Sequence, residues 1–128
     1  MTMQTKKKVL LIDDEKDFCF FVSRNLEQTG EFQVLTATNG EEGISLARKE
    51  KPDVILLDIV MPKVYGPDVA EVLVADPKTK DIPLIFLTAV VTEKEVGVES
   101  IKEIGGHNFI AKPVDTERLI SSIKMVLK

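Results

Sequence analysis

The chain has 128 residues, of which 44% are hydrophobic and 30% charged, and its formal net charge is −4. This length and composition predict an ordinary globular domain with one substantial core. The acidic balance argues against direct nucleic-acid binding, because domains of that kind need a basic excess to neutralise phosphates. The basic start is followed by too few apolar residues for a signal peptide or a membrane helix, so we expect a cytoplasmic protein without membrane contact. The single cysteine, Cys19, excludes an internal disulfide and predicts a small packing residue.

Strand-like and helix-like stretches alternate five times along the chain. Continuous apolar runs predict buried strands, and apolar residues at helical spacing predict helices. Asn39 is expected to cap one helix, and Gly30 to stand at the C′ position of another. The expected strands cover residues 8–12, 32–38, 54–58, 82–88 and 108–111. The expected helices cover residues 17–29, 40–50, 67–75, 92–104 and 116–127.

This alternation predicts an α/β fold. Strands that alternate with helices across short connections favour a parallel sheet with helices on both faces and right-handed crossovers. Five units of this size fit a doubly wound, five-stranded parallel sheet in the order 2-1-3-4-5, the flavodoxin-like three-layer α/β/α arrangement. In that order, ligands bind outside the carboxyl ends of the strands, at the switch point between the first and third strands. The residues that follow these strands are therefore the candidates for a functional site.

Carboxylates follow both strands at the switch point. Asp58 ends the apolar run of residues 54–58, and Asp13 and Asp14 follow the first strand. A carboxylate at the end of a buried strand needs a cation, hydrogen bonds or an open cleft. Because the first and third strands are neighbours in the predicted order, the three carboxylates are expected to converge. Hard oxygen ligands of this kind suit Mg²⁺.

Two further residues are expected on the other side of Asp58. Thr88 ends the fourth strand, and Lys112 follows the fifth. An acidic cluster that attracts a metal, flanked by a cation and a hydroxyl, matches the requirements of phosphoryl transfer, namely charge neutralisation and an in-line nucleophile. Asp58 would be that nucleophile, and the product would be an acyl phosphate.

With these residues in place, the chain resembles the receiver domain of bacterial two-component response regulators, of the chemotaxis-regulator kind, over essentially its whole length. The stretches that carry the resemblance are residues 11–15, 57–66, 82–89 and 106–113. The resemblance implies a single receiver domain spanning residues 1–128, which accepts a phosphoryl group on Asp58 from a sensor histidine kinase or a phosphotransfer protein. It further implies that the domain changes conformation and signals to a downstream protein target by contact, as a monomer or weak dimer and without conventional enzymatic turnover.

The resemblance also implies a role for each acidic residue at the site. Asp14, Asp58 and the backbone carbonyl of Val60 would bind Mg²⁺, and Asp13 would act largely through water. Val60 and Val90 would flank the attacking water. Because apolar side chains cannot orient water, slow self-dephosphorylation is expected.

The remaining roles fall on the fourth and fifth strands. Thr88, the backbone amide of Ala89 and Lys112 would hold the phosphoryl oxygens. Phe109 would change rotamer when Thr88 moves, although an ordinary core aromatic is an alternative interpretation. The bond before Pro113 would be cis, an expectation that rests wholly on the resemblance because few X-Pro bonds are cis.

Helix 17–29 carries a candidate docking residue. At about 100° per residue, Phe20 points nearly opposite to the expected inner face, with Cys19 at the border between the two faces. The expected inner face is formed by Phe18, Phe21, Val22 and Leu26. An aromatic on the solvent face beside the acidic site predicts partner docking, although single exposed apolar residues are common.

Other functional classes agree less well with the sequence. A flavin-mononucleotide-binding electron carrier shares the fold, but residues 13–15 are acidic and would repel a phosphate that lacks metal. A phosphatase of the haloacid dehalogenase kind needs a second Asp two residues after its nucleophile, and Val60 stands there. The alternative within signalling is a receiver fragment of a longer regulator, with an output domain after Lys128.

Overall fold

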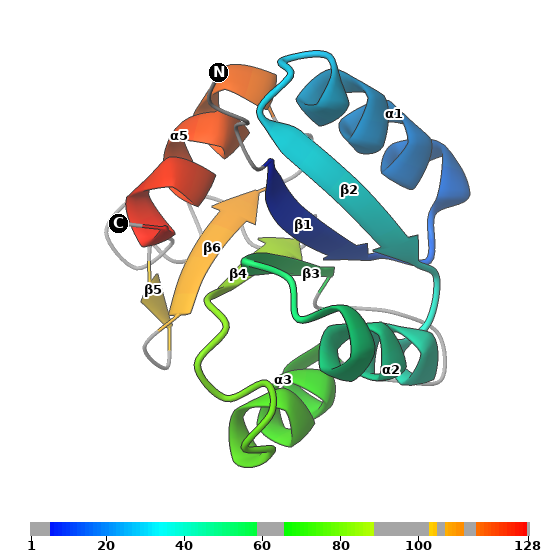
Figure 1. Cartoon of the computed structure of the whole chain (residues 1–128), viewed down its shortest axis with the longest axis vertical. Coiled ribbons are helices and arrows are strands. Elements are labelled where there is room, and N and C mark those ends of the chain that lie inside the picture. Colours follow the sequence, from blue (N-terminus) through cyan, green and yellow to red (C-terminus); the bar gives the residue numbers. More distant parts are fainter. Residues whose placement is uncertain (1–5, 59–65, 89–102, 105–106, 112–114, 128) are drawn as a thin grey trace, which may run out of the picture.

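The computed structural model describes residues 6–58, 66–88, 103–104, 107–111 and 115–127. Figure 1 shows how its helices and strands are arranged. The strands are β1 (Lys7–Ile12), β2 (Phe32–Ala37), β3 (Val54–Asp58), β4 (Leu84–Thr88), β5 (Glu103–Ile104) and β6 (His107–Ala111). The helices are α1 (Lys16–Glu27), α2 (Gly40–Glu50), α3 (Gly66–Ala75) and α5 (Thr116–Val126). Among the helices of the described residues, none has the length and apolar character needed to span a bilayer.

Five parallel strands of the sheet follow the predicted order. From one edge to the other the sheet runs β2-β1-β3-β4-β6-β5, and each neighbouring pair from β2 through β6 is parallel. Strand β6 is thus the fifth parallel strand. The doubly wound, flavodoxin-like fold predicted from the sequence is confirmed.

One short strand departs from the prediction. Strand β5 pairs antiparallel with β6, with Ile104 opposite His107, so the sheet has six strands rather than five. The predicted helix over residues 92–104 is therefore wrong at its last two residues, and the rest of it lies outside the described residues. In the sequence, Gly105 and Gly106 separate the two strands. A Gly-Gly pair is typical of tight hairpins, so the turn chemistry favours strand pairing over a longer helix.

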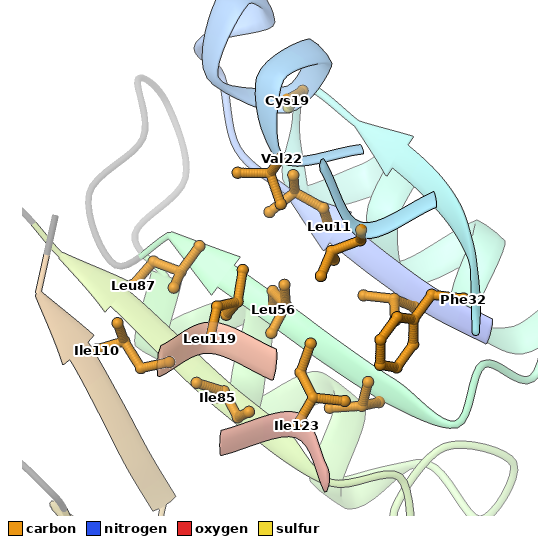
Figure 2. Packing of buried hydrophobic residues seen from close by; sticks show 13 residues of the cluster. Leu11, Cys19, Val22, Phe32, Leu56, Ile85, Leu87, Ile110, Leu119 and Ile123 are labelled. Carbon is orange, nitrogen blue, oxygen red and sulfur yellow. The ribbon is translucent and has the colours of Figure 1, made fainter. Parts of the chain in front are cut away.

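Each face of the sheet carries its own hydrophobic core. Helices α1 and α5 cover one face, and α2 and α3 cover the other (Figure 1). Side chains alternate between the two cores along β1, with Leu11 in the first and Leu10 and Ile12 in the second. Figure 2 shows the first core, where side chains of α1 and α5 meet those of the central strands. Because β1 and β3 are covered on both faces, their carboxyl ends are held in fixed positions.

Helix ends follow the expected capping chemistry. The Asn39 side chain accepts a hydrogen bond from the backbone N–H of Glu42 (2.8 Å) at the start of α2, as predicted. Asp115 caps α5 in the same way, accepting from the N–H of Arg118 at 3.2 Å. Helix α1 ends earlier than predicted, so Gly30 lies two residues beyond its C-cap rather than at C′. Its φ of +80° still requires glycine's conformational freedom.

Helix α1 is rotated relative to the predicted inner face. Cys19, Val22 and Leu26 are buried, whereas Phe21 is 53% exposed. These three buried residues fall within an arc of about 60° on a helical wheel, and Phe21 lies well outside that arc. The prediction for Phe21 was wrong because the small Cys19, not the larger aromatic, fits against the sheet. Phe20 is 68% exposed, as predicted.

Candidate functional site

Three aspartates converge at the carboxyl ends of β1 and β3. Ile12 lies opposite Leu57 in the parallel register, so the next residues, Asp13 and Asp58, lie side by side at the edge of the sheet. One carboxylate oxygen from each of Asp13, Asp14 and Asp58 lies within 4.8 Å of the others. The convergence predicted from the strand order is confirmed.

The turn out of β1 fixes the position of Asp13. Its backbone N–H donates to the carbonyl of Ala37 (2.9 Å), which extends the pairing of β1 with β2 by one residue. Its Oδ1 accepts from the backbone N–H of Glu15 (2.9 Å), the local bond by which Asp side chains stabilise turns. The Cys19 thiol donates to the Asp13 carbonyl oxygen at 3.3 Å. Asp13 is therefore held through both its backbone and its side chain.

Glu15 and Cys19 are contributors to the site that the sequence interpretation missed. The signal was present in part, because an Asp side chain commonly accepts a hydrogen bond from the backbone N–H two residues later, the usual Asx-turn spacing. The thiol contact had no local signal, since it depends on the rotation of α1 that places Cys19 inward. Cys19 is a packing residue, as predicted, and it also links the first turn of α1 to Asp13.

The electrostatics of this cluster favour a bound cation. Asp13 is fully buried, Asp58 is 5% exposed and Asp14 is half-buried. At an effective dielectric constant of about 20, two full charges within 4.8 Å repel each other by roughly 3 kcal/mol. The donors are all carboxylate oxygens, which select hard divalent cations such as Mg²⁺ over softer metals. The residues present therefore fit the ion that the sequence predicted.

The fourth and fifth parallel strands end at the same edge as the acidic cluster. Asp58 lies opposite Leu87, so Thr88 is the next residue beyond it along β4. Thr88 in turn lies opposite Ala111, the last residue of β6. Phe109 lies opposite Phe86 within the sheet. The register thus agrees with the predicted order of strand ends.

Several predicted site residues lie outside the described residues. They are Val60, Ala89, Val90, Lys112 and Pro113. Their roles therefore stay predictions: the Val60 carbonyl as a metal ligand, the Ala89 amide and Lys112 as phosphoryl-binding groups, and a cis bond before Pro113. The side-chain roles of Thr88 and Phe109 also stay predictions.

The fold and the site together define a class of protein, the flavodoxin-like α/β domains with a carboxylate cluster at the switch point. Comparison with known families then narrows this class. The family model for the response regulator receiver domain matches residues 9–124. The chain therefore belongs to the response regulator receiver domain family, and it is a phosphoacceptor signalling domain.

Individual relatives support the same assignment. The protein PilH of Pseudomonas aeruginosa is 39% identical over 122 residues, which cover 94% of this chain and 97% of PilH. The transcriptional regulator RpaA of a Synechocystis species is 36% identical over 123 residues, which cover 94% of this chain and 49% of RpaA. The chain thus spans about half the length of such transcriptional regulators.

Solved structures share the fold over nearly the whole chain. The chemotaxis protein CheY4 of Vibrio cholerae matches with a TM-score of 0.81 and 28% identity, covering 96% of this chain and all of that one. A response regulator from Desulfuromonas acetoxidans matches with a TM-score of 0.80 and 33% identity, covering 94% of this chain and 96% of that one. These similarities agree with the receiver assignment.

Proposed function

We propose that Asp58 is the phosphoacceptor. A carboxylate oxygen of Asp58 attacks the phosphorus of a phosphohistidine on a sensor kinase or phosphotransfer protein. The P–O bond forms as the P–N bond breaks, and the histidine leaves. The observation that carries this proposal is the packing of Asp58 with two other carboxylates at the switch point of the sheet.

Mg²⁺ would be held by Asp14, Asp58 and the backbone carbonyl of Val60, with Asp13 acting through water. When bound, this ion would supply the positive charge that phosphoryl transfer needs. The burial of Asp13 and its bond to the N–H of Glu15 support an orienting role rather than a mobile one. The chain's own contribution is to hold these oxygens together before the phosphoryl group arrives.

On the other side of Asp58, Thr88, the Ala89 amide and Lys112 would hold the phosphoryl oxygens. Phe109 would couple the movement of Thr88 to a change of surface, and Lys112–Pro113 would be cis. The position of Thr88 one residue beyond the partner of Asp58 supports its part in this arrangement. With Val60 and Val90 beside the site, the phosphoryl group would be lost slowly and without turnover of external substrates.

The phosphodonor protein would dock on α1. Phe20 is 68% exposed and Phe21 53% exposed, and α1 begins three residues after Asp13, at the acidic edge. Two exposed aromatics beside the phosphoacceptor suit a surface that is covered during transfer.

Residues 1–128 would act as a single receiver in the cytoplasm, as a monomer or weak dimer without membrane or nucleic-acid contact, either alone or joined to an output domain. Its signal would pass to a downstream protein by contact.

The phosphoacceptor is tested with acetyl phosphate and Mg²⁺, followed by intact-mass measurement. The wild-type protein is expected to gain one phosphoryl group, and Asp58→Asn none. Asp53→Asn removes the same charge at the amino end of β3, opposite to Asp58, and should label like the wild type. Omission of Mg²⁺ should prevent labelling. Equal labelling of Asp58→Asn and the wild type would refute the proposal.

Docking is tested separately from chemistry. Phe20→Ala should accept phosphate from a phosphorylated kinase several-fold more slowly, because buried aromatics dominate such contacts, yet should label normally with acetyl phosphate. Met125→Ala, which truncates a 72% exposed side chain on α5, is the matched control and should leave both rates unchanged. A normal transfer rate for Phe20→Ala would remove Phe20 from the docking surface.

A further inference from the structure

The outer surfaces of α2 and α3 form an open groove that the receiver reaction does not use. Its volume is about 510 Å³, and its lining includes Glu41, Ile44, Arg48 and Lys49 of α2, Val72 of α3, and Lys78 of the following turn. The two helices lie side by side on the face of the sheet opposite α1 and α5 (Figure 1). The groove is therefore separate from the exposed aromatics of α1.

The lining of the groove includes two apolar side chains, Ile44 of α2 and Val72 of α3, which we call its apolar floor. Ile44 is half-buried, and Val72 is 42% exposed, which makes it one of the large hydrophobic side chains left in solvent among the described residues. The lining positions on α2 recur at three- and four-residue spacing, so they form one continuous stripe. An apolar floor between two helices is the geometry that accepts a third helix.

One end of the groove is basic although the chain as a whole is acidic, with a net charge of −4. Arg48 donates to the carboxylate of Asp76. The backbone N–H of Lys78 and the Arg48 side chain together lower the pKa of Asp76. The charges of Arg48 and Asp76 therefore balance each other. Within the described residues, neither Lys49 nor Lys78 forms an ion pair, and both are exposed.

Helix energetics alone explain only part of this arrangement. Arg48 and Lys49 lie in the last turn of α2, where cations favour the helix dipole. That reason does not extend to Lys78, which lies beyond the end of α3, or to the exposed Val72. The basic end and the apolar floor together indicate a binding surface.

We propose that this groove binds an acidic amphipathic helix of another protein. Two apolar side chains of that helix, one turn apart, pack on Ile44 and Val72, and its carboxylates face Lys49 and Lys78. From Glu41 to Arg48 the groove extends about 10 Å, the length of two helical turns. Nucleic acid is disfavoured as the occupant, because Glu41 lines the groove and would oppose a phosphate backbone.

The groove would stay accessible while Asp58 reacts. Helix α2 begins directly after the carboxyl end of β2 and runs back across the sheet, so its basic last turn lies at the end opposite the acidic cluster. A helix bound over Lys49 and Lys78 thus leaves the carboxyl ends of β1 and β3 open. This binding does not depend on phosphorylation.

The test is a titration of the ¹⁵N-labelled full chain with two synthetic helical peptides, followed by amide chemical shifts. One peptide carries two Leu residues one turn apart and Glu at one end, and the other has Lys at each Glu position. The acidic peptide is expected to shift amides of α2 and α3 saturably. Lys49→Glu/Lys78→Glu should weaken its binding by roughly tenfold, the sum expected for two surface ion pairs. Lys16→Glu/Arg24→Glu makes the same charge change on α1 and should leave the affinity unchanged.

The apolar floor gives a second, uncharged variant. Val72→Ala should weaken binding without changing the charge, and it keeps the proposal testable if the double charge reversal unfolds the protein. Equal binding of both peptides, equal loss in the α1 control, or shifts on another face would overturn the proposal. So would sedimentation that shows a dimer abolished by Lys49→Glu/Lys78→Glu without peptide, because the occupant would then be a second copy of this chain.

Discussion

The two ends of the sheet carry their charges in opposite arrangements. At the carboxyl ends of β1 and β3, three aspartates place oxygens of like charge within 4.8 Å of one another. At the amino end, carboxylates are paired with donors: the backbone N–H of Lys8 donates to Asp53 Oδ2 at 2.7 Å, and the ammonium of Lys8 lies 3.4 Å from Oε1 of Glu50. The same strands thus begin among complementary charges and end among repelling ones.

The paired charges connect elements that are distant in sequence. The bonds of Lys8 reach to the end of α2 and the start of β3, and Lys124 of α5 lies 2.9 Å from Glu31 just before β2. The ion pairs of the described residues therefore lie at the amino end of the sheet, away from the acidic cluster. The carboxyl end can keep an arrangement that is unfavourable without a cation, because the rest of the fold fixes its position. Substitutions at the two ends should consequently have opposite effects on stability.

Asp13→Asn is expected to have the largest effect at the carboxyl end. Asparagine keeps the acceptor for the N–H of Glu15 but removes one of three like charges. Mg²⁺ affinity should fall by roughly 10–100-fold, as for other residues that orient metal ligands indirectly. In the absence of Mg²⁺ the variant should be more stable than the wild type, by roughly 1–3 kcal/mol, because less repulsion remains. Calorimetric Mg²⁺ titration and urea unfolding in a chelator measure the two effects.

The same change at the amino end serves as the control for this prediction. Asp53→Asn should leave Mg²⁺ affinity unchanged and should not raise stability. If Asp13→Asn instead lowers the stability of the metal-free protein, repulsion is not the dominant feature of the acidic cluster. The contrast between the two ends of the sheet would then fail.

Much of the carboxyl end could be predicted from the sequence, because two local signals determine it. The apolar run of residues 54–58 indicates a strand buried on both faces, and the alternation of strands and helices favours one strand order. Once β1 and β3 are neighbours, Asp13 and Asp58 must meet. No knowledge of side-chain packing is needed for that step.

The parts that were missed depend on contacts between distant residues. The inward face of α1 could not be settled from periodicity, because Cys19 and Phe21 both fit a helical stripe and only the space above the sheet decides between them. The pairing of β5 with β6 overrode the helical prediction at residues 103–104. The pairing of Lys8 with Asp53 joins residues 45 positions apart, and it has no local sequence signal.

Gly43→Ala tests how tightly α2 packs against β1 next to the acidic cluster. A Cβ on Gly43 would overlap Cδ1 of Ile12 and lie 2.7 Å from its Cγ1, and Ile12 directly precedes Asp13. Overpacking of this kind costs about 1–3 kcal/mol, which should exceed the gain of about 1 kcal/mol in helix propensity. Urea unfolding is expected to show a net loss.

Ile12→Val removes the overlapping methyl and should rescue the variant. In a double-mutant cycle, Gly43→Ala should cost less in the Ile12→Val background, with a coupling of about 0.5–1.5 kcal/mol. Gly30→Ala is the matched control: its Cβ meets no atom within 4 Å, and its cost comes from the φ of +80°. That cost should be the same with either residue at position 12. Additive effects of Gly43→Ala and Ile12→Val would show that the contact does not limit the approach of α2.

Asp53→Ala gives the smallest expected effect, and it lies at the amino end. Asp53 and Lys8 are joined twice: the Lys8 N–H donates to Asp53 Oδ2 at 2.7 Å, and the Asp53 N–H donates to the Lys8 carbonyl at 2.8 Å. Alanine keeps the second bond and loses the first, which should lower the free energy of unfolding by about 1 kcal/mol. Asp53→Asn retains an acceptor and should lose less. Both variants should label with acetyl phosphate at the wild-type rate, because the change lies a full strand length from Asp58. If Asp53→Ala loses labelling while its fold is retained, the amino end of the sheet helps to position Asp58. The division between the two ends of the sheet would then be incomplete.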